Sequence, residues 1–117
     1  MKLTWLTDIH LNFLDDEARQ KFYDKITNTH CDVVLISGDI AEASCVVDLL
    51  TEMAAHIKKP IYFVLGNHDY YRGTVDDVRE KMYVLTQKEK YLYWLPAAGL
   101  ISLSDDVILI PAGGESC

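Results

Sequence analysis

The sequence predicts an α/β fold in which a parallel sheet comes first and antiparallel β structure follows. Three short apolar runs alternate with segments whose apolar residues recur every three or four positions. Consecutive apolar residues are typical of strands buried on both faces of a parallel sheet, and the longer period indicates amphipathic helices between them. After the third helical segment, short strands follow one another without a helix, which favours antiparallel pairing.

The first strand and helix are expected at residues 3–7 and 15–28. Within the helix, Ala18, Phe22 and Ile26 recur every four residues and form one apolar face. Three acidic residues open the helix and suit the positive end of its dipole: Asp15, Asp16 and Glu17.

The second strand and helix are expected at residues 32–37 and 43–58. The strand contains the continuous apolar run Val33-Val34-Leu35-Ile36. Pro60 ends the helix because proline cannot continue one. The apolar face of this helix consists of Val46, Leu50, Met53 and Ile57.

The third strand and helix are expected at residues 61–65 and 74–88. Thr74 is suited to cap the helix N-terminus, where Asp76 and Asp77 also favour the dipole. The apolar stripe of this helix consists of Val75, Val78, Met82 and Leu85.

The C-terminal part of the chain is expected to be antiparallel. Residues 91–95 form a short aromatic strand before Pro96, and residues 100–103 and 107–110 flank a Ser104-Asp105-Asp106 turn that predicts a β-hairpin. We expect the aromatic strand to supply the packing face of a second sheet rather than a base-stacking platform, through Tyr91, Tyr93 and Trp94.

Composition predicts one compact, acidic domain. The chain has 117 residues, half of them apolar, which is enough for a hydrophobic core. Its net charge of −7 repels polyanions, so nucleic-acid binding is disfavoured. If the substrate is a small phosphorylated molecule, metal cations are needed to bring it in.

Cysteine usage and apolar runs indicate the compartment. Cys31, Cys45 and Cys117 are widely spaced and odd in number, which fits neither a disulfide framework nor a zinc ribbon. A reduced, cytoplasmic protein is therefore expected. No run approaches the ~18 apolar residues of a membrane span, and polar residues interrupt the N-terminus where a signal peptide would be apolar.

Each of the three buried strands is followed directly by potential metal ligands. Asp8 and His10 follow the first strand, Asp39 follows the second, and Asn67 and His68 follow the third. Because the carboxyl ends of parallel strands meet at one edge of a sheet, these side chains are expected to converge.

The ligand types fit a specific chemistry. Carboxylate and imidazole donors suit Mn²⁺, Fe and Zn²⁺. Asp8 and His10 flank one residue, so in an extended segment both can bind one ion. Asp39 has two oxygens that could bridge two ions, and Asn67 offers a neutral carbonyl. Two ions about 3.5–4 Å apart could generate a bridging hydroxide and hold the phosphate oxygens during displacement.

Asp-x-His, Gly-Asp and Gly-Asn-His-Asp, in this order, resemble the first three motifs of the calcineurin-like metallophosphoesterases, over residues 1–110. The resemblance implies two divalent ions (Mn, Fe, Zn or Mg, with Mn favoured). Asp8 and His10 would bind the first ion, Asp39 would bridge both, and Asn67 would bind the second. The resemblance also implies that His68 contacts the phosphate and acts as general acid, with Asp69 orienting or polarising it.

Two departures from the family pattern limit the resemblance. The run from Gly38 to Ala43 lacks the Asp-Arg-Gly of the serine/threonine phosphatases, so that branch is disfavoured. The family also has a further histidine and a Gly-His-x-His motif downstream, and the chain stops at Cys117 before either. We therefore expect residues 1–117 to be one truncated domain, half of a four-layer α/β/β/α sandwich.

Three functions remain open. The first is a metal-dependent phosphoesterase acting on a phosphate mono- or diester. The second is a catalytically incomplete fragment or interaction module, since the second ion would have only Asp39 and Asn67 where catalytic metals need about three protein ligands; exposed sheet surface would then favour a homo-oligomer. The third, another class of nucleotide-binding protein, is disfavoured because no Gly-x-Gly-x-x-Gly or P-loop motif occurs.

Several other residues have an ordinary explanation. His30 and His56 lie near the ends of predicted helices, away from the expected site, and Glu42 suits a helix N-terminus. Cys31, beside a buried strand, is expected in the core. Two tyrosines after the third motif could border a substrate pocket, although packing is the more common role: Tyr70 and Tyr71.

Overall fold

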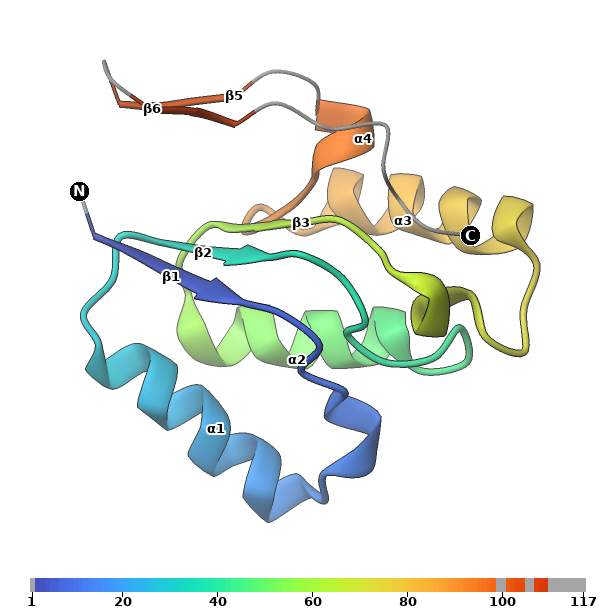
Figure 1. Cartoon of the computed structure of the whole chain (residues 1–117), viewed down its shortest axis with the longest axis horizontal. Helices are drawn as coiled ribbons and strands as arrows, with labels where there is room; N and C mark the ends of the chain where they lie inside the picture. Colours follow the sequence, from blue (N-terminus) through green and yellow to red (C-terminus); the bar gives the residue numbers. More distant parts are fainter. Residues whose placement is uncertain (1, 99–100, 105–106, 110–117) are drawn as a thin grey trace.

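A four-stranded parallel sheet forms the centre of the fold (Figure 1). The computed structural model describes residues 2–98, 101–104 and 107–109. The strands lie side by side in chain order and all pair in parallel, which confirms the predicted parallel α/β arrangement. They are β1 (Leu3–Leu6), β2 (Val33–Ile36), β3 (Ile61–Phe63) and β4 (Leu92–Trp94).

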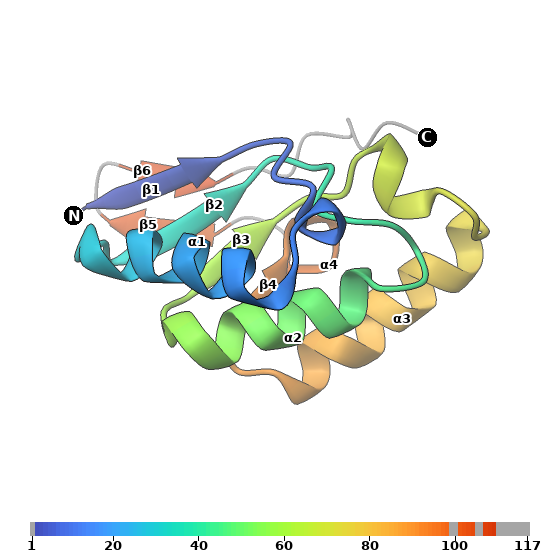
Figure 2. The ribbon, with the colours of Figure 1, turned by 90° about the horizontal axis from the view of Figure 1, so that it is seen from below.

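Three helices connect these strands and lie along one face of the sheet (Figure 2). They are α1 (Asp16–Asn28), α2 (Val46–Ile57) and α3 (Val75–Lys88). Asp15 and Thr74 cap α1 and α3, since their side chains accept the backbone N–H of Ala18 and Asp77. The helix α2 ends at Ile57, and the C-cap residue Lys58 adopts the left-handed conformation common at helix ends.

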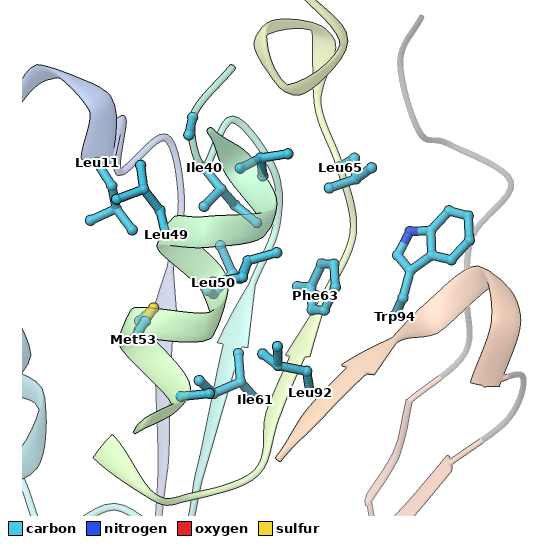
Figure 3. Packing of buried hydrophobic residues seen from close by; sticks show 14 of the residues in the cluster. Leu11, Ile40, Leu49, Leu50, Met53, Ile61, Phe63, Leu65, Leu92 and Trp94 are labelled. Atoms are coloured by element: carbon cyan, nitrogen blue, oxygen red, sulfur yellow. The ribbon is translucent and has the colours of Figure 1, made fainter. Parts of the chain in front are cut away.

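The main core lies between the helices and the facing side of the sheet (Figure 3). Phe63 and Trp94 of the strands and Leu50 and Met53 of α2 are completely buried there. Burying a side chain of this size contributes roughly 1.5–3 kcal/mol, so this face supplies most of the hydrophobic stabilisation of the fold.

The opposite face of the sheet is only partly covered. Val33, Tyr62 and Leu95 form a small buried cluster, whereas Trp5 on β1 is 67% exposed. Tyr93 stacks on Tyr62 at 4.8 Å between ring centroids. This face is apolar and carries none of the three long helices.

The aromatic strand belongs to the parallel sheet, which corrects its predicted place in a second sheet. β4 pairs with β3, with Ile61 opposite Leu92. Because side chains alternate along a strand, Trp94 enters the helix-covered core while Tyr93 lies on the opposite face.

The short elements after β4 are α4 (Leu95–Ala98), β5 (Ile101–Ser104) and β6 (Val107–Leu109). β5 and β6 pair antiparallel, with Ile101 opposite Leu109, and lie across the sheet from α1 and α2 (Figure 1). Residues 105–106 of the predicted turn, and Leu100 and Ile110, lie outside the described residues. The four-layer sandwich stays a prediction.

Candidate metal centre

The loops that follow β1, β2 and β3 meet at the carboxyl end of the sheet (Figure 1). Three backbone N–H groups of the first loop donate to carbonyls of the second. The N–H of Asp8 bonds to Gly38 O at 3.1 Å, and that of His10 bonds to Asp39 O at 3.1 Å. The N–H of Leu11 bonds to Ile40 O at 2.7 Å. The two motif segments are therefore held against each other by their main chains.

In the first two of these loops, three residues adopt the left-handed backbone conformation, which is uncommon for residues other than glycine. The φ angles are 52° for Asp8, 44° for His10 and 52° for Asp39. Each such residue costs on the order of 1–3 kcal/mol, and the conformation persists only where the surroundings enforce it. Gly38, at φ 122°, provides the adjoining turn that other residues adopt poorly.

One carboxylate and two imidazoles come together from the three loops. Potential ligand atoms of His10, Asp39 and His68 all lie within 4.8 Å of one another. Nδ1 of His68 is 3.5 Å from Oδ2 of Asp39, and the imidazole rings of His10 and His68 are 5.0 Å apart at nearly a right angle. The arrangement offers nitrogen and oxygen donors to a single point.

The electrostatics of this cluster favour an ionised Asp39. Burial alone would raise the pKa of Asp39, but the backbone N–H of His68 and contacts with the side chains of Asp8 and His68 hold that pKa below its ordinary value. The N–H of His68 donates to Oδ1 of Asp39 at 3.0 Å. An anionic carboxylate beside a second carboxyl group is a setting that a divalent cation would stabilise.

The predicted ligands do not all occupy equivalent positions. Asp8 lies beside Asp39 without joining the three-residue cluster, and Asn67 begins the 3₁₀ helix Asn67–Tyr70 in an exposed position. The cluster instead includes His68, which sequence reasoning assigned only to acid catalysis. Its imidazole could have been considered a ligand from the same motif. The donor set contains no thiolate and fits Mn²⁺, Fe or Zn²⁺.

A protein-family model for calcineurin-like phosphoesterases matches residues 1–116. The chain belongs to the calcineurin-like phosphoesterase family. Searches of the curated proteins and of the solved structures returned no match. At the family level, this membership and the His-Asp-His cluster support a metal-dependent phosphoesterase. None of the helices in the described part of the chain combines the length and apolarity of a membrane span.

Asp69 is completely buried. Its carboxylate accepts the backbone N–H groups of Ile40, Ala41 and Gly66, at 2.8, 2.7 and 2.9 Å. Burial raises the pKa of Asp69 to about 6, although the three N–H donors act in the opposite direction. The role predicted for Asp69, orienting or polarising His68, stays a prediction.

Two exposed aromatic side chains border the His10, Asp39 and His68 cluster. Phe13 is 73% exposed and stacks on the His10 ring at 5.3 Å. Tyr71 is 56% exposed, with its ring 6.4 Å from that of His68 and the Arg72 guanidinium 5.8 Å from its centroid. Phe13 was not recognised in the sequence, where only its position three residues after His10 could have pointed to it.

The remaining candidate residues lie elsewhere. Tyr70 is buried in the main core, as is Cys31. His56 lies in the last turn of α2, where Nε2 is 2.8 Å from Oδ1 of Asp24. A groove of about 570 Å³ between α2 and α3 is lined by apolar and charged residues, none of them in the metal-ligand cluster.

Proposed function

We propose that this calcineurin-like phosphoesterase domain hydrolyses a small phosphate mono- or diester with two divalent metal ions, of which Mn²⁺ is favoured. The observation that supports the proposal most is the convergence of His10, Asp39 and His68 from three separate loops. Such convergence at the carboxyl end of a parallel sheet is the usual place for an active site.

The proposed ligand roles follow the order of the loops. Asp8 and His10 would hold one ion, Asp39 would contribute to both, and Asn67 would contribute to the second. Bound divalent ions would supply Lewis acidity, activate water and neutralise charge on phosphate oxygens. This contribution matters for a chain whose net charge is −7, because the protein itself repels an anionic substrate.

His68 is the proposed general acid. Its side chain is half-exposed, so a bound substrate can reach it. Its backbone N–H and its imidazole both face Asp39, which fixes the residue beside the proposed metal ligands. An imidazole so placed can give its proton to the leaving oxygen of the ester.

Hydrolysis of an aryl phosphate monoester and an aryl phosphate diester tests the proposal. Mn²⁺ is expected to stimulate turnover, a chelator to remove it, and Asp39→Asn to abolish it. Asp48→Asn, an exposed change in the first turn of α2, is the matched control and should retain turnover. Turnover by the wild-type chain no greater than that of Mn²⁺ alone would contradict the proposal and favour the incomplete fragment or interaction module.

Exposed apolar surface favours a second property, self-association through the helix-free face of the sheet. Among the residues of β1 to β4, Trp5 is the most exposed on this face, and Leu3 and Tyr93 are also exposed. Burying such a patch against a second copy would remove apolar area from water. Size-exclusion chromatography with light scattering should show dimers that Trp5→Ser converts to monomers, and a wild-type chain that stays monomeric at every concentration would contradict self-association.

A further inference from the structure

One buried carboxylate joins the two loops that carry Asp39 and His68. Oδ1 of Asp69 accepts the N–H groups of the two residues that follow Asp39, and Oδ2 accepts the N–H of Gly66. We propose that Asp69 is a positioning residue that sets the separation of these loops and thereby the geometry of the metal ligands. The inference rests on the proposed metal-dependent function.

The three hydrogen bonds explain why the residue is an aspartate. Ile40, Ala41 and Gly66 are buried, so their N–H groups need an acceptor within the protein. A buried donor left unpaired is destabilising. A carboxylate offers two oxygens with free lone pairs, whereas the amide of asparagine offers one oxygen and would place an NH₂ group against an N–H donor.

Gly66 shows how closely the two loops approach. A Cβ atom at this position would lie 2.3 Å from Oδ1 of Asp39 and 2.7 Å from its backbone nitrogen. The φ angle of Gly66 is −111°, so the need for glycine comes from this close approach and not from its backbone conformation. The carboxylate of Asp69 thus holds the two loops together, and the lack of a side chain at Gly66 allows them to come this close.

Asp69 therefore acts on the ligands through the main chain. Its bonds to Ile40 and Ala41 hold the segment directly after Asp39, and its bond to Gly66 holds the segment directly before Asn67. The direct bond from the His68 N–H to Asp39 depends on the same separation. A shift of either loop would therefore change the positions of the metal ligands. Substitution of residues that support metal ligands typically lowers metal affinity 10–100-fold.

Co²⁺ binding to the full chain, followed by visible absorption, tests the role without requiring turnover. Asp69→Asn and Gly66→Ala are each expected to weaken Co²⁺ affinity by about 10–100-fold and to change the d–d spectrum of the bound ion. Glu52→Gln is the matched control, because Glu52 accepts from Arg19, Gln20 and Tyr23 between α1 and α2, away from the site. Glu52→Gln should lower thermal stability and leave the Co²⁺ spectrum and affinity unchanged.

Far-UV circular dichroism would establish the temperature at which every variant is folded. A folded Asp69→Asn chain with wild-type Co²⁺ spectrum and affinity would overturn the inference. If Asp69→Asn does not fold, Gly66→Ala decides, because an unchanged spectrum there would show that the loop separation does not set the ligand geometry. A wild-type chain that binds Co²⁺ but hydrolyses no ester would end the proposed function alone. Failure of the wild-type chain to bind Co²⁺ would overturn both.

Discussion

The two ends of the sheet use the same uncommon backbone conformation for different reasons. At the amino end, His30 and Lys58 have φ angles of 54° and 55°, and each lies at the end of a helix, where a left-handed residue is common. At the carboxyl end, Asp8, His10 and Asp39 follow strands, and helix termination cannot explain them. A left-handed residue at a helix end therefore needs no functional explanation. A left-handed residue that carries a potential metal ligand and lies away from a helix end points to function.

Asp39→Gly separates the backbone conformation of this residue from its side-chain chemistry, since glycine accepts the left-handed conformation but lacks the carboxylate. Turnover should fall about 10²–10³-fold, because several kcal/mol of metal-derived stabilisation would be lost. The free energy of unfolding of the metal-free chain should change by only about 1 kcal/mol, the value of the lost hydrogen bond to His68. Steady-state kinetics and urea denaturation measure the two quantities, and turnover close to wild type would show that Asp39 is a structural residue.

Asp69→Ala tests whether the buried carboxylate of Asp69 holds together the loops that follow β2 and β3. Three buried N–H groups would lose their acceptor, and the free energy of unfolding should fall by about 3 kcal/mol. Asp48→Ala, an exposed change on α2, should stay within about 0.5 kcal/mol of wild type. Urea denaturation measures the free energy of unfolding of both variants. Equal losses would show that the Asp69 carboxylate does not hold these loops together.

Substitution of the two exposed aromatic residues beside the cluster tests whether the substrate contacts side chains other than the proposed metal ligands. Phe13→Ala and Tyr71→Ala should each raise KM for an aryl phosphate about fivefold, since a ring–ring contact contributes about 1 kcal/mol. The value of kcat should stay close to wild type because neither residue lies in the metal-ligand cluster. A fall in kcat with unchanged KM would place these side chains in the chemical step instead.

Lys58→Gly is the smallest expected effect and concerns the amino end. Glycine removes the steric cost of the left-handed conformation but adds entropy to the unfolded chain, so the free energy of unfolding should rise by about 0.5 kcal/mol. Metal affinity should not change. A thermal-unfolding series with and without Mn²⁺ would measure both, and a loss of metal affinity would contradict the distinction between the two ends.

The helices were largely predictable because their signals are local. Thr74 caps α3 as predicted. Asp15 was predicted as an acidic residue of the first turn and is the N-cap of α1. The start of α2 was predicted at residue 43 but lies at Val46. The N–H of Ala43, predicted as the first helical residue, bonds to the carbonyl of Tyr71. The place of β4 was also wrong, since its pairing with β3 joins segments distant in sequence.

The general position of the site was predictable from the sequence, but its hydrogen bonds were not. Strand order and motif position predicted Asp8, His10, Asp39, Asn67 and His68 at one edge of the sheet, and of these His10, Asp39 and His68 have potential ligand atoms within 4.8 Å of one another. The hydrogen bonds of Asp69 were not predictable, because its acceptor role depends on how the second loop folds back toward the third. The first strand was predicted to be buried like the other two, which is wrong: none of the residues of β1 is fully buried, and Trp5 is 67% exposed.

Anomalous diffraction from crystals of the chain grown with Mn²⁺ tests the central claim most directly. The account predicts a manganese peak within bonding distance of the Asp39 carboxylate and of the His10 imidazole, and no such peak in Asp39→Gly crystals. A wild-type structure with manganese only at other carboxylates, and none at Asp39, would contradict it.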